Sequence, residues 1–209
     1  GVVPPLPGFL EGLRRLCSRH DALLIFDEVI TGFRLAPGGA MAYFNVEADL
    51  VTYGKIIGGG MPVGAYAGRR DIMEWVAPAG NVYQAGTLSG NPVAMAAGIA
   101  ALTVLRDTPE IYEKTTRLAC RLAEGLRKEI SCTVNQVGSL LCPFFTKQPV
   151  VDYASACSSD TARYARYFHH MLDNGVYIAP SQFEAMFLSA AHTDEDINYT
   201  LDIVKKFGG

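Results

Sequence analysis

A single lysine, Lys55, stands in a nearly uncharged and glycine-rich stretch at residues 53–62. A lysine held in a dry pocket loses part of its preference for the proton, and its free amine can then attack a carbonyl carbon. The three glycines that follow at 58–60 permit positive φ angles and the close approach of a ligand. The stretch therefore fits a lysine that forms an imine with an aldehyde. A surface lysine at the mouth of a glycine-rich turn is the alternative.

Two acids, Asp27 and Glu28, follow a continuous apolar run at residues 22–26. Such a run predicts a parallel strand that is buried on both faces. In open α/β sheets, ligands bind beyond the carboxyl ends of the strands. A carboxylate at this place can hold a cationic nitrogen of a ligand. The alternative is a helix cap or a solvated strand end.

A third polar cluster lies at residues 83–92 and opens a helix. Pro92 suits the first position of that helix. Backbone amides at the helix start, together with the hydroxyls of Thr87 and Ser89, could bind a phosphate. An ordinary turn with capping residues is the alternative.

The elements around these residues predict how they are positioned. A short strand at 49–53 delivers Lys55 at its carboxyl end, so the acids and the lysine should emerge at one edge of a parallel sheet. The remaining predicted elements of this part are an amphipathic helix at 9–20, a strand at 62–68, a helix at 70–75 and a buried, alanine-rich helix at 93–105.

A long amphipathic helix at 111–130 is expected to lead into a second domain. The predicted fold class is α/β, with a mainly parallel-sheet domain at 1–107 and a connecting helix with a small α+β domain at 108–209. The second domain should contain strands at 134–137, 140–145, 176–179 and 185–189, and helices at 161–174 and 194–207.

Composition excludes several classes of protein. The 209 residues are 49% hydrophobic and 19% charged, which is typical of a folded chain. The net charge of −3 shows no excess of basic residues that would favour binding to nucleic acid or to an anionic membrane. The longest apolar run, 93–105, is too short to span a bilayer. Five cysteines without a Cys-x-x-Cys pair predict no disulfide framework, no metal site and a reducing compartment.

Together, the three clusters describe a site for pyridoxal 5′-phosphate. A lysine can bind the cofactor aldehyde and then shuttle protons once the substrate amine displaces it. A carboxylate such as that of Asp27 can keep the pyridine nitrogen protonated, so that the ring accepts electrons from a carbanion. The glycine, threonine and serine turn can hold the phosphate.

The order of the motifs at 27–34, 54–60 and 86–92 resembles the fold-type I, class III family of pyridoxal phosphate-dependent aminotransferases. Within that family the chain closely resembles the branch of glutamate-1-semialdehyde 2,1-aminomutases. The discriminating stretches are 83–92, 179–185 and 191–197. The resemblance covers essentially the whole chain, but only about the C-terminal half of the family's enzyme.

This resemblance implies roles for individual cofactor-binding residues. Asp27 pairs with the pyridine nitrogen, and Val29 packs against the ring. Lys55 is the Schiff-base and proton-transfer residue. Thr87, with Gly86, reaches the cofactor phosphate of the neighbouring subunit, so the resemblance also implies a homodimer.

The branch implies the substrate and the reaction. Glutamate 1-semialdehyde is converted to 5-aminolevulinate for tetrapyrrole biosynthesis, and Tyr83 and Glu184 lie near the bound substrate. An ordinary aminotransferase uses an arginine for the α-carboxylate of its second substrate. No arginine stands between Tyr177 and His192, which agrees with an aminomutase. The alternatives are another class III aminotransferase acting on an ω-amine, or a non-catalytic fragment.

Two departures from the family pattern matter. The chain begins at Gly1 without methionine, and the family's other phosphate loop, ring-stacking aromatic residue, lid and carboxylate grip lie upstream of it. We therefore expect these 209 residues alone to have little or no activity. The second departure is the stretch Leu140–Pro143, which puts the local packing of the small domain in doubt, because proline in a strand is tolerated only at an edge or a bulge. The pathway implies a bacterial cytoplasm or, in a photosynthetic eukaryote, the plastid stroma.

Overall fold

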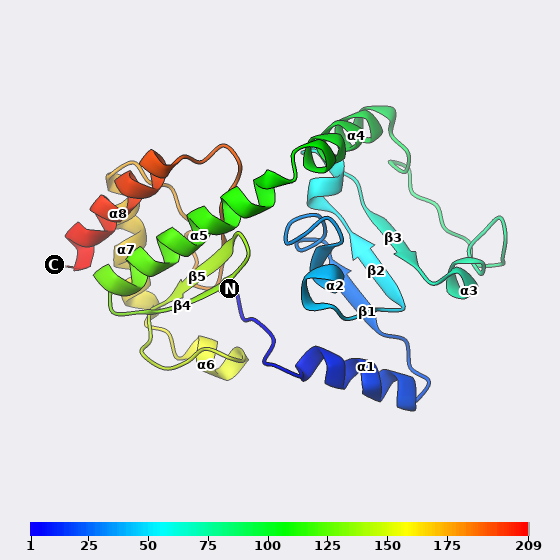
Figure 1. Cartoon of the computed structure of the whole chain (residues 1–209), viewed down its shortest axis with the longest axis horizontal. Helices are drawn as coiled ribbons and strands as arrows, with labels where there is room; N and C mark the ends of the chain where they lie inside the picture. Colours follow the sequence, from blue (N-terminus) through cyan, green and yellow to red (C-terminus); the bar gives the residue numbers. More distant parts are fainter. Residues whose placement is uncertain (209) are drawn as a thin grey trace. The chain divides into compact units, whose positions relative to one another are not determined.

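Three strands form the sheet that positions Asp27 and Lys55. In the computed structural model, which describes residues 1–208, these are β1 (Ile25–Glu28), β2 (Leu50–Tyr53) and β3 (Ala65–Gly68), in the order β1-β2-β3 (Figure 1). β1 and β2 are parallel, as the sequence predicts. β3 runs antiparallel to β2, so only part of the sheet is parallel.

The sheet belongs to a unit that comprises Pro7–Pro109. The helix expected at 9–20 is present as α1 (Phe9–Arg19). Its other helices are α2 (Gly39–Phe44), the 3-10 helix η1 (Lys55–Gly58), α3 (Arg70–Met73) and α4 (Pro92–Asp107). The sequence did not predict α2, because the residues before it are rich in proline and glycine.

Two predictions of burial are wrong for this unit. The strand expected to be buried on both faces is largely exposed, with Ile25 at 57% exposure. The alanine-rich helix α4 buries only Ala94 and Gly98, and Ile99 is 67% exposed. The physical reason is that α4 packs against η1 on one side only, and the sheet has three strands within residues 1–208.

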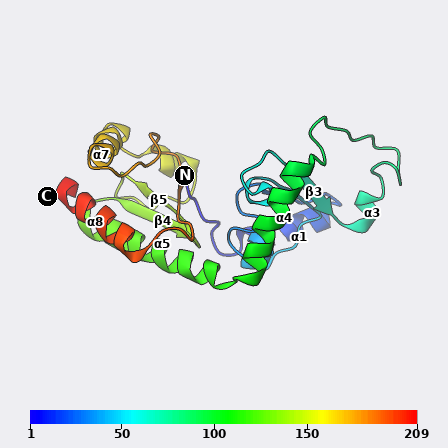
Figure 2. The same cartoon turned by 90° about the horizontal axis from the view of Figure 1, so that it is seen from above.

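The second unit comprises Gly1–Leu6 together with Glu110–Gly209. Its elements are α5 (Glu110–Glu129), β4 (Thr133–Val137), β5 (Leu140–Phe144), α6 (Tyr153–Cys157), α7 (Thr161–Asp173), β6 (Met186–Phe187) and α8 (Asp194–Gly208). Figure 2 shows α5 and α8 running side by side. Buried side chains of α5, α7, α8 and the sheet form one core, which includes Leu118, Leu141, Tyr167 and Val204.

The first residues of the chain lie with this second unit, which differs from the predicted division at 107. Val2 is buried, and its carbonyl oxygen accepts a hydrogen bond from Asn135 Nδ2 at 3.1 Å. The Gly1 nitrogen donates to the carbonyl oxygen of Phe183. These bonds, together with the burial of Val2, hold residues 1–6 against the small sheet, and the main division of the chain falls between Pro109 and Glu110.

Pro143 lies in β5, the middle strand of the sheet β4-β5-β6. β6 pairs only with Leu140 and Leu141, so β5 has no second neighbouring strand at Pro143. The Gln182 side chain lies there instead. Its Nε2 donates to the Pro143 carbonyl at 2.7 Å, and its Oε1 accepts from the Phe145 amide at 3.2 Å. The proline therefore sits where no ladder hydrogen bond is required of its nitrogen.

The predicted strand at 176–179 is wrong, because these residues form no ladder in the structure. Among residues 1–208, no helix is both long and apolar enough to cross a membrane.

Candidate active site

Asp27 and Lys55 emerge at the same edge of the sheet because β1 and β2 are parallel. In the register of the two strands, Asp27 lies opposite Thr52, and Glu28 lies opposite Tyr53. Lys55 follows β2 by two residues. The predicted placement of an acid and a lysine at one edge of a parallel pair is therefore confirmed.

The Asp27 carboxylate is exposed, and hydrogen bonds hold only one of its two oxygens. Its Oδ1 accepts hydrogen bonds from the Val29 amide at 3.0 Å and from Thr52 Oγ1 at 3.2 Å. Both donors use the same oxygen, so Oδ2 is left to bind a ligand. The sequence analysis missed Thr52, although strand alternation and the register of β2 could have indicated it.

Lys55 occupies the first position of η1 with a φ of 49°, in the left-handed region that non-glycine residues rarely adopt. Gly54 before it is extended, and the two together turn the chain sharply out of β2. The side chain of Lys55 is exposed in the described residues. The dry pocket expected around it is therefore not formed by residues 1–208.

Glycines let the lysine turn approach α4 at backbone distance. A Cβ on Gly59 would lie 2.5 Å from the Ala97 carbonyl oxygen, and one on Gly98 would lie 2.2 Å from the Ile57 carbonyl oxygen. Both positions exclude any side chain. The glycines predicted to admit a ligand thus also fix η1 against α4.

Val29 connects the acid to the lysine. The isopropyl group of Val29 is half-buried against Gly54, where a Cβ would lie 3.2 Å from Val29 Cγ1. The residue that follows Gly54 is Lys55. Asp27, Val29 and Lys55 are therefore brought into one neighbourhood.

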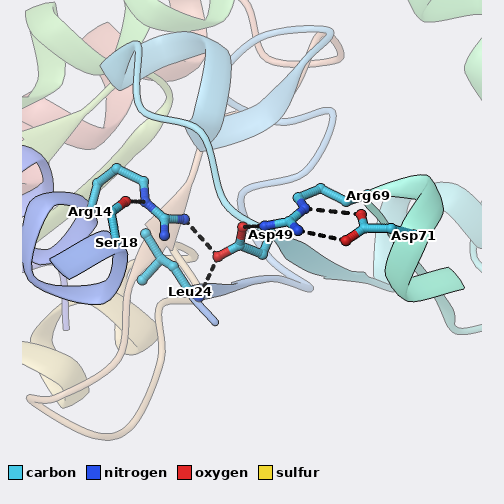
Figure 3. Close-up of polar contacts among 6 residues, drawn as sticks. All are labelled: Arg14, Ser18, Leu24, Asp49, Arg69 and Asp71. Carbon is cyan, nitrogen blue, oxygen red and sulfur yellow. Dashed lines mark hydrogen bonds and ion pairs between the residues drawn. The ribbon is translucent and has the colours of Figure 1, made fainter. Parts of the chain in front are cut away.

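A buried carboxylate, that of Asp49, fastens the far ends of the same two strands (Figure 3). Its Oδ2 accepts from the Leu24 amide at 2.8 Å and from Arg14 at 2.7 Å, and its Oδ1 accepts from Arg69 at 2.8 Å. The Leu24 amide, followed by the two guanidinium groups, lowers the pKa of Asp49 to about 2. Because Arg14 lies on α1 and Arg69 follows β3, the network ties α1 and the end of β3 to the strands that carry the site.

The turn before α4 has the capping geometry that its sequence indicates. Asn91 Oδ1 accepts from the amides of Val93 at 3.0 Å and Ala94 at 3.2 Å, and Pro92 is the first helical residue. These amides are occupied, so a phosphate must be bound by groups that precede the helix. Thr87 is exposed in that preceding turn.

A largely apolar groove of about 700 Å³ adjoins this turn. Gly86 and Ser89 of the turn line it together with Tyr53 and Ile57 from the lysine segment. The Ser89 amide donates to the Gly86 carbonyl at 2.9 Å, which closes the turn. Residues of the predicted phosphate turn and of η1 therefore line the same groove. Asp27, Lys55 and Thr87 do not line it.

The two predicted substrate residues are placed differently. Tyr83 is 84% exposed in the loop before the turn. Glu184 belongs to the second unit, where its amide donates to the Ser181 carbonyl at 3.2 Å and its side chain lines a cavity of about 600 Å³. These local contacts do not test whether Tyr83 and Glu184 bind the substrate, so their roles stay predictions. Within residues 1–208, no group of three or more histidine, cysteine or acidic side chains could hold a metal ion.

Comparison with known proteins gives a consistent result. The sequence profile of the family described as aminotransferase class-III matches residues 1–207. The chain is 67% identical over 207 residues to the glutamate-1-semialdehyde 2,1-aminomutase of Acetivibrio thermocellus, covering 99% of this chain and 48% of that protein. The chain thus spans about half the length of the curated relatives it matches.

Solved structures agree with this similarity. A β-phenylalanine aminotransferase from Variovorax paradoxus superposes with a TM-score of 0.89 at 34% identity, over 99% of this chain and 49% of that one. A glutamate-1-semialdehyde aminomutase from Pseudomonas aeruginosa PAO1 in complex with PMP has a TM-score of 0.87 at 26% identity, with the same coverage. The fold is that of the pyridoxal phosphate-dependent transferases, as the sequence predicts.

Proposed function

Because this chain belongs to the class III aminotransferase family, we propose that it carries the catalytic lysine of a glutamate-1-semialdehyde 2,1-aminomutase. The observation that supports the chemistry is the delivery of Asp27 and Lys55 to one edge of a parallel strand pair. The observation that supports the substrate is the name of the relatives that match essentially the whole chain at high identity. The proposed reaction is an isomerisation in which amino and carbonyl groups exchange places within glutamate 1-semialdehyde.

The residues present fit pyridoxal 5′-phosphate. Asp27 offers Oδ2 to a protonated ring nitrogen while its Oδ1 is held by Val29 and Thr52. Val29 lies against Gly54, next to the lysine, where its methyl groups can contact a ring. The Lys55 side chain is exposed at the same edge and would supply the amine that binds the cofactor aldehyde. These three residues would hold the cofactor.

The cofactor, when bound, supplies an electron-accepting ring that stabilises negative charge at the substrate carbon next to nitrogen. Asp27 keeps the proton on the ring nitrogen, which preserves that electron-accepting character. With the cofactor and substrate bound, the free Lys55 Nζ would remove a proton from one carbon and return it to another. A single amine on a fixed turn serves both positions, because η1 is held against α4 by backbone-to-glycine contacts.

The remaining roles extend this proposal. Thr87, with Gly86, binds the cofactor phosphate of a second subunit in a homodimer, and exposure of the whole 86–90 turn is compatible with that contact. Tyr83 and Glu184 contact the substrate. The protein resides in a bacterial cytoplasm or a plastid stroma, which is supported by five free thiols among the described residues.

Another class III aminotransferase is the second candidate, because transaminase structures superpose as well as the aminomutase does. Such an enzyme needs a cation for an external substrate's carboxylate. In the second unit Arg117 and Arg121 bind Asp194, Arg127 donates to the Val134 carbonyl, and Arg163 donates to the Ser131 carbonyl, whereas Arg166 is exposed on α7. The engagement of the first four arginines, with no arginine between Tyr177 and His192, favours the aminomutase.

The test is to supply the native protein with glutamate 1-semialdehyde and no amino acceptor, and to measure 5-aminolevulinate. We expect sustained product formation under these conditions. Absence of 5-aminolevulinate, together with transfer of the amino group to an added keto acid to give the corresponding amino acid, would identify an ordinary aminotransferase instead.

A further inference from the structure

Glu28, the neighbour of Asp27, is a buried carboxylate that the proposed chemistry does not use. Its exposure is 1%, whereas Asp27 is exposed. Successive side chains of a strand point to opposite faces, so the two acids at the end of β1 cannot serve the same ligand. A buried acid needs several hydrogen bonds to offset the loss of hydration.

Three donors converge on the Glu28 carboxylate. Oε2 accepts from Thr31 Oγ1 at 2.9 Å and from the Ala40 amide at 2.6 Å, and Oε1 accepts from the Met41 amide at 2.9 Å. Backbone amides can only donate, so each carboxylate oxygen faces at least one group that requires an acceptor.

The same contacts close the segment between β1 and α2. The Gly32 amide donates to the Glu28 carbonyl at 2.9 Å, which forms the turn after Val29. Gly39, with a φ of 65°, lies so close to the carboxylate that a Cβ would stand 2.1 Å from Oε2. Glu28 thus fixes both ends of the segment through its backbone and its side chain.

Val29 is the first residue of this closed segment, and it has two contacts with the site. Its amide donates to Asp27 Oδ1, and its side chain packs on Gly54, which precedes Lys55. Anything that sets the position of Val29 therefore sets the orientation of the Asp27 carboxylate and the packing beside the lysine turn.

We propose that Glu28 is a positioning residue whose buried carboxylate holds the 29–41 segment and thereby aims Asp27 and Val29 at the cofactor. The proposal rests on the proposed function, since it presumes a cofactor at this edge of the sheet. A carboxylate is required, because a glutamine would place its NH₂ group against one of the two amides in either orientation. One buried donor would then be left unpaired.

The first experiment uses the native protein without added cofactor. In Glu28→Gln, hydrogen exchange at the Ala40 and Met41 amides should accelerate about tenfold, as expected when a buried bond is lost. The matched control is Glu47→Gln, the same chemical change at an exposed position outside the site. Unchanged exchange in Glu28→Gln would overturn the proposal.

The second experiment adds pyridoxal 5′-phosphate and follows the visible absorption band as a function of pH. Glu28→Gln should shift the midpoint of the band's titration and weaken cofactor binding several-fold, while Glu47→Gln behaves as the wild type. Thr31→Val removes only the hydroxyl donor and should produce a smaller change in the same direction, which keeps the test valid if Glu28→Gln does not fold. Loss of thermal stability without any change in the spectrum or the affinity would assign Glu28 a merely structural role.

These readouts separate this proposal from the proposed function. A wild-type protein that binds the cofactor but forms no 5-aminolevulinate would refute the aminomutase assignment and leave the role of Glu28 intact. A wild-type enzyme that forms 5-aminolevulinate, with a Glu28→Gln variant identical to it in spectrum, affinity and turnover, would refute the role of Glu28 alone.

Discussion

Replacing Asp49 by asparagine removes the charge that joins α1, β2 and the end of β3. Asp49 is 4% exposed, and the Leu24 amide with Arg14 and Arg69 lowers its pKa from 3.8 to about 2. A shift of that size corresponds to at most about 2.4 kcal/mol of folding free energy. Arg69 is half-exposed, so solvent screening reduces the expected loss in Asp49→Asn to about 1–2 kcal/mol at neutral pH.

The pH dependence gives the sign of the effect. The folded-state pKa is depressed, so the stabilisation is fully present above the unfolded-state value of about 3.8 and is lost as pH falls toward 2. The difference in unfolding free energy between wild type and Asp49→Asn should therefore be constant from pH 7 to about 5 and shrink below about 4.

Urea unfolding at a series of pH values measures this difference directly. The control is Asp71→Asn, because Asp71 also binds Arg69 but is exposed, so its loss should leave the unfolding free energy nearly unchanged. Equal stability of Asp49→Asn and wild type at pH 7 would refute the reasoning. So would a difference that does not change between pH 6 and the acid limit.

Three further predictions follow from single contacts. Thr52→Val leaves Asp27 with one fixed donor, so pyridoxal 5′-phosphate affinity should fall about 3- to 10-fold by spectroscopic titration; unchanged affinity would contradict the role of Thr52. Gly59→Ala places a Cβ 2.5 Å from the Ala97 carbonyl oxygen at positive φ, so thermal unfolding should show a loss of about 2–3 kcal/mol; a neutral result would mean that η1 can move from α4. Gln182→Leu leaves the Pro143 carbonyl and the Phe145 amide without their partner and should cost about 2–4 kcal/mol in urea unfolding; a neutral result would mean that water replaces the amide.

The placement of Asp27 and Lys55 was predictable from the sequence, because residue type and strand direction both point to the same edge of the sheet. Asp27 and Lys55 each follow a short apolar run, and two parallel strands bring their carboxyl ends to one edge. The start of α4 was equally predictable, because Asn91 and Pro92 have strong positional preferences at a helix start.

Burial was less predictable, because it depends on what packs against an element rather than on the element itself. The runs at 22–26 and 93–105 read as buried on all sides, yet Ile25 and Ile99 are exposed in the described residues. The direction of β3 is likewise set by pairing with β2, and no periodicity within 62–68 encodes it.

The different roles of the adjacent acids Asp27 and Glu28 could not be predicted from the sequence. Asp27 and Glu28 look equivalent as a pair. Their difference arises from strand alternation and from the amides of Ala40 and Met41, which lie 12 and 13 residues away along the chain. The proline- and glycine-rich residues before α2 give no local cap, and its first amides are instead capped by the Glu28 side chain from β1.

The most direct test of the central claim is to identify the lysine that binds the cofactor. The native protein is incubated with pyridoxal 5′-phosphate, reduced with borohydride, digested and mapped by mass spectrometry. The account predicts that the pyridoxyl label lies on Lys55 in stoichiometric amount and that Lys55→Ala abolishes both the label and 5-aminolevulinate formation while the fold survives. A label on another lysine, or near-normal turnover in Lys55→Ala, would contradict it.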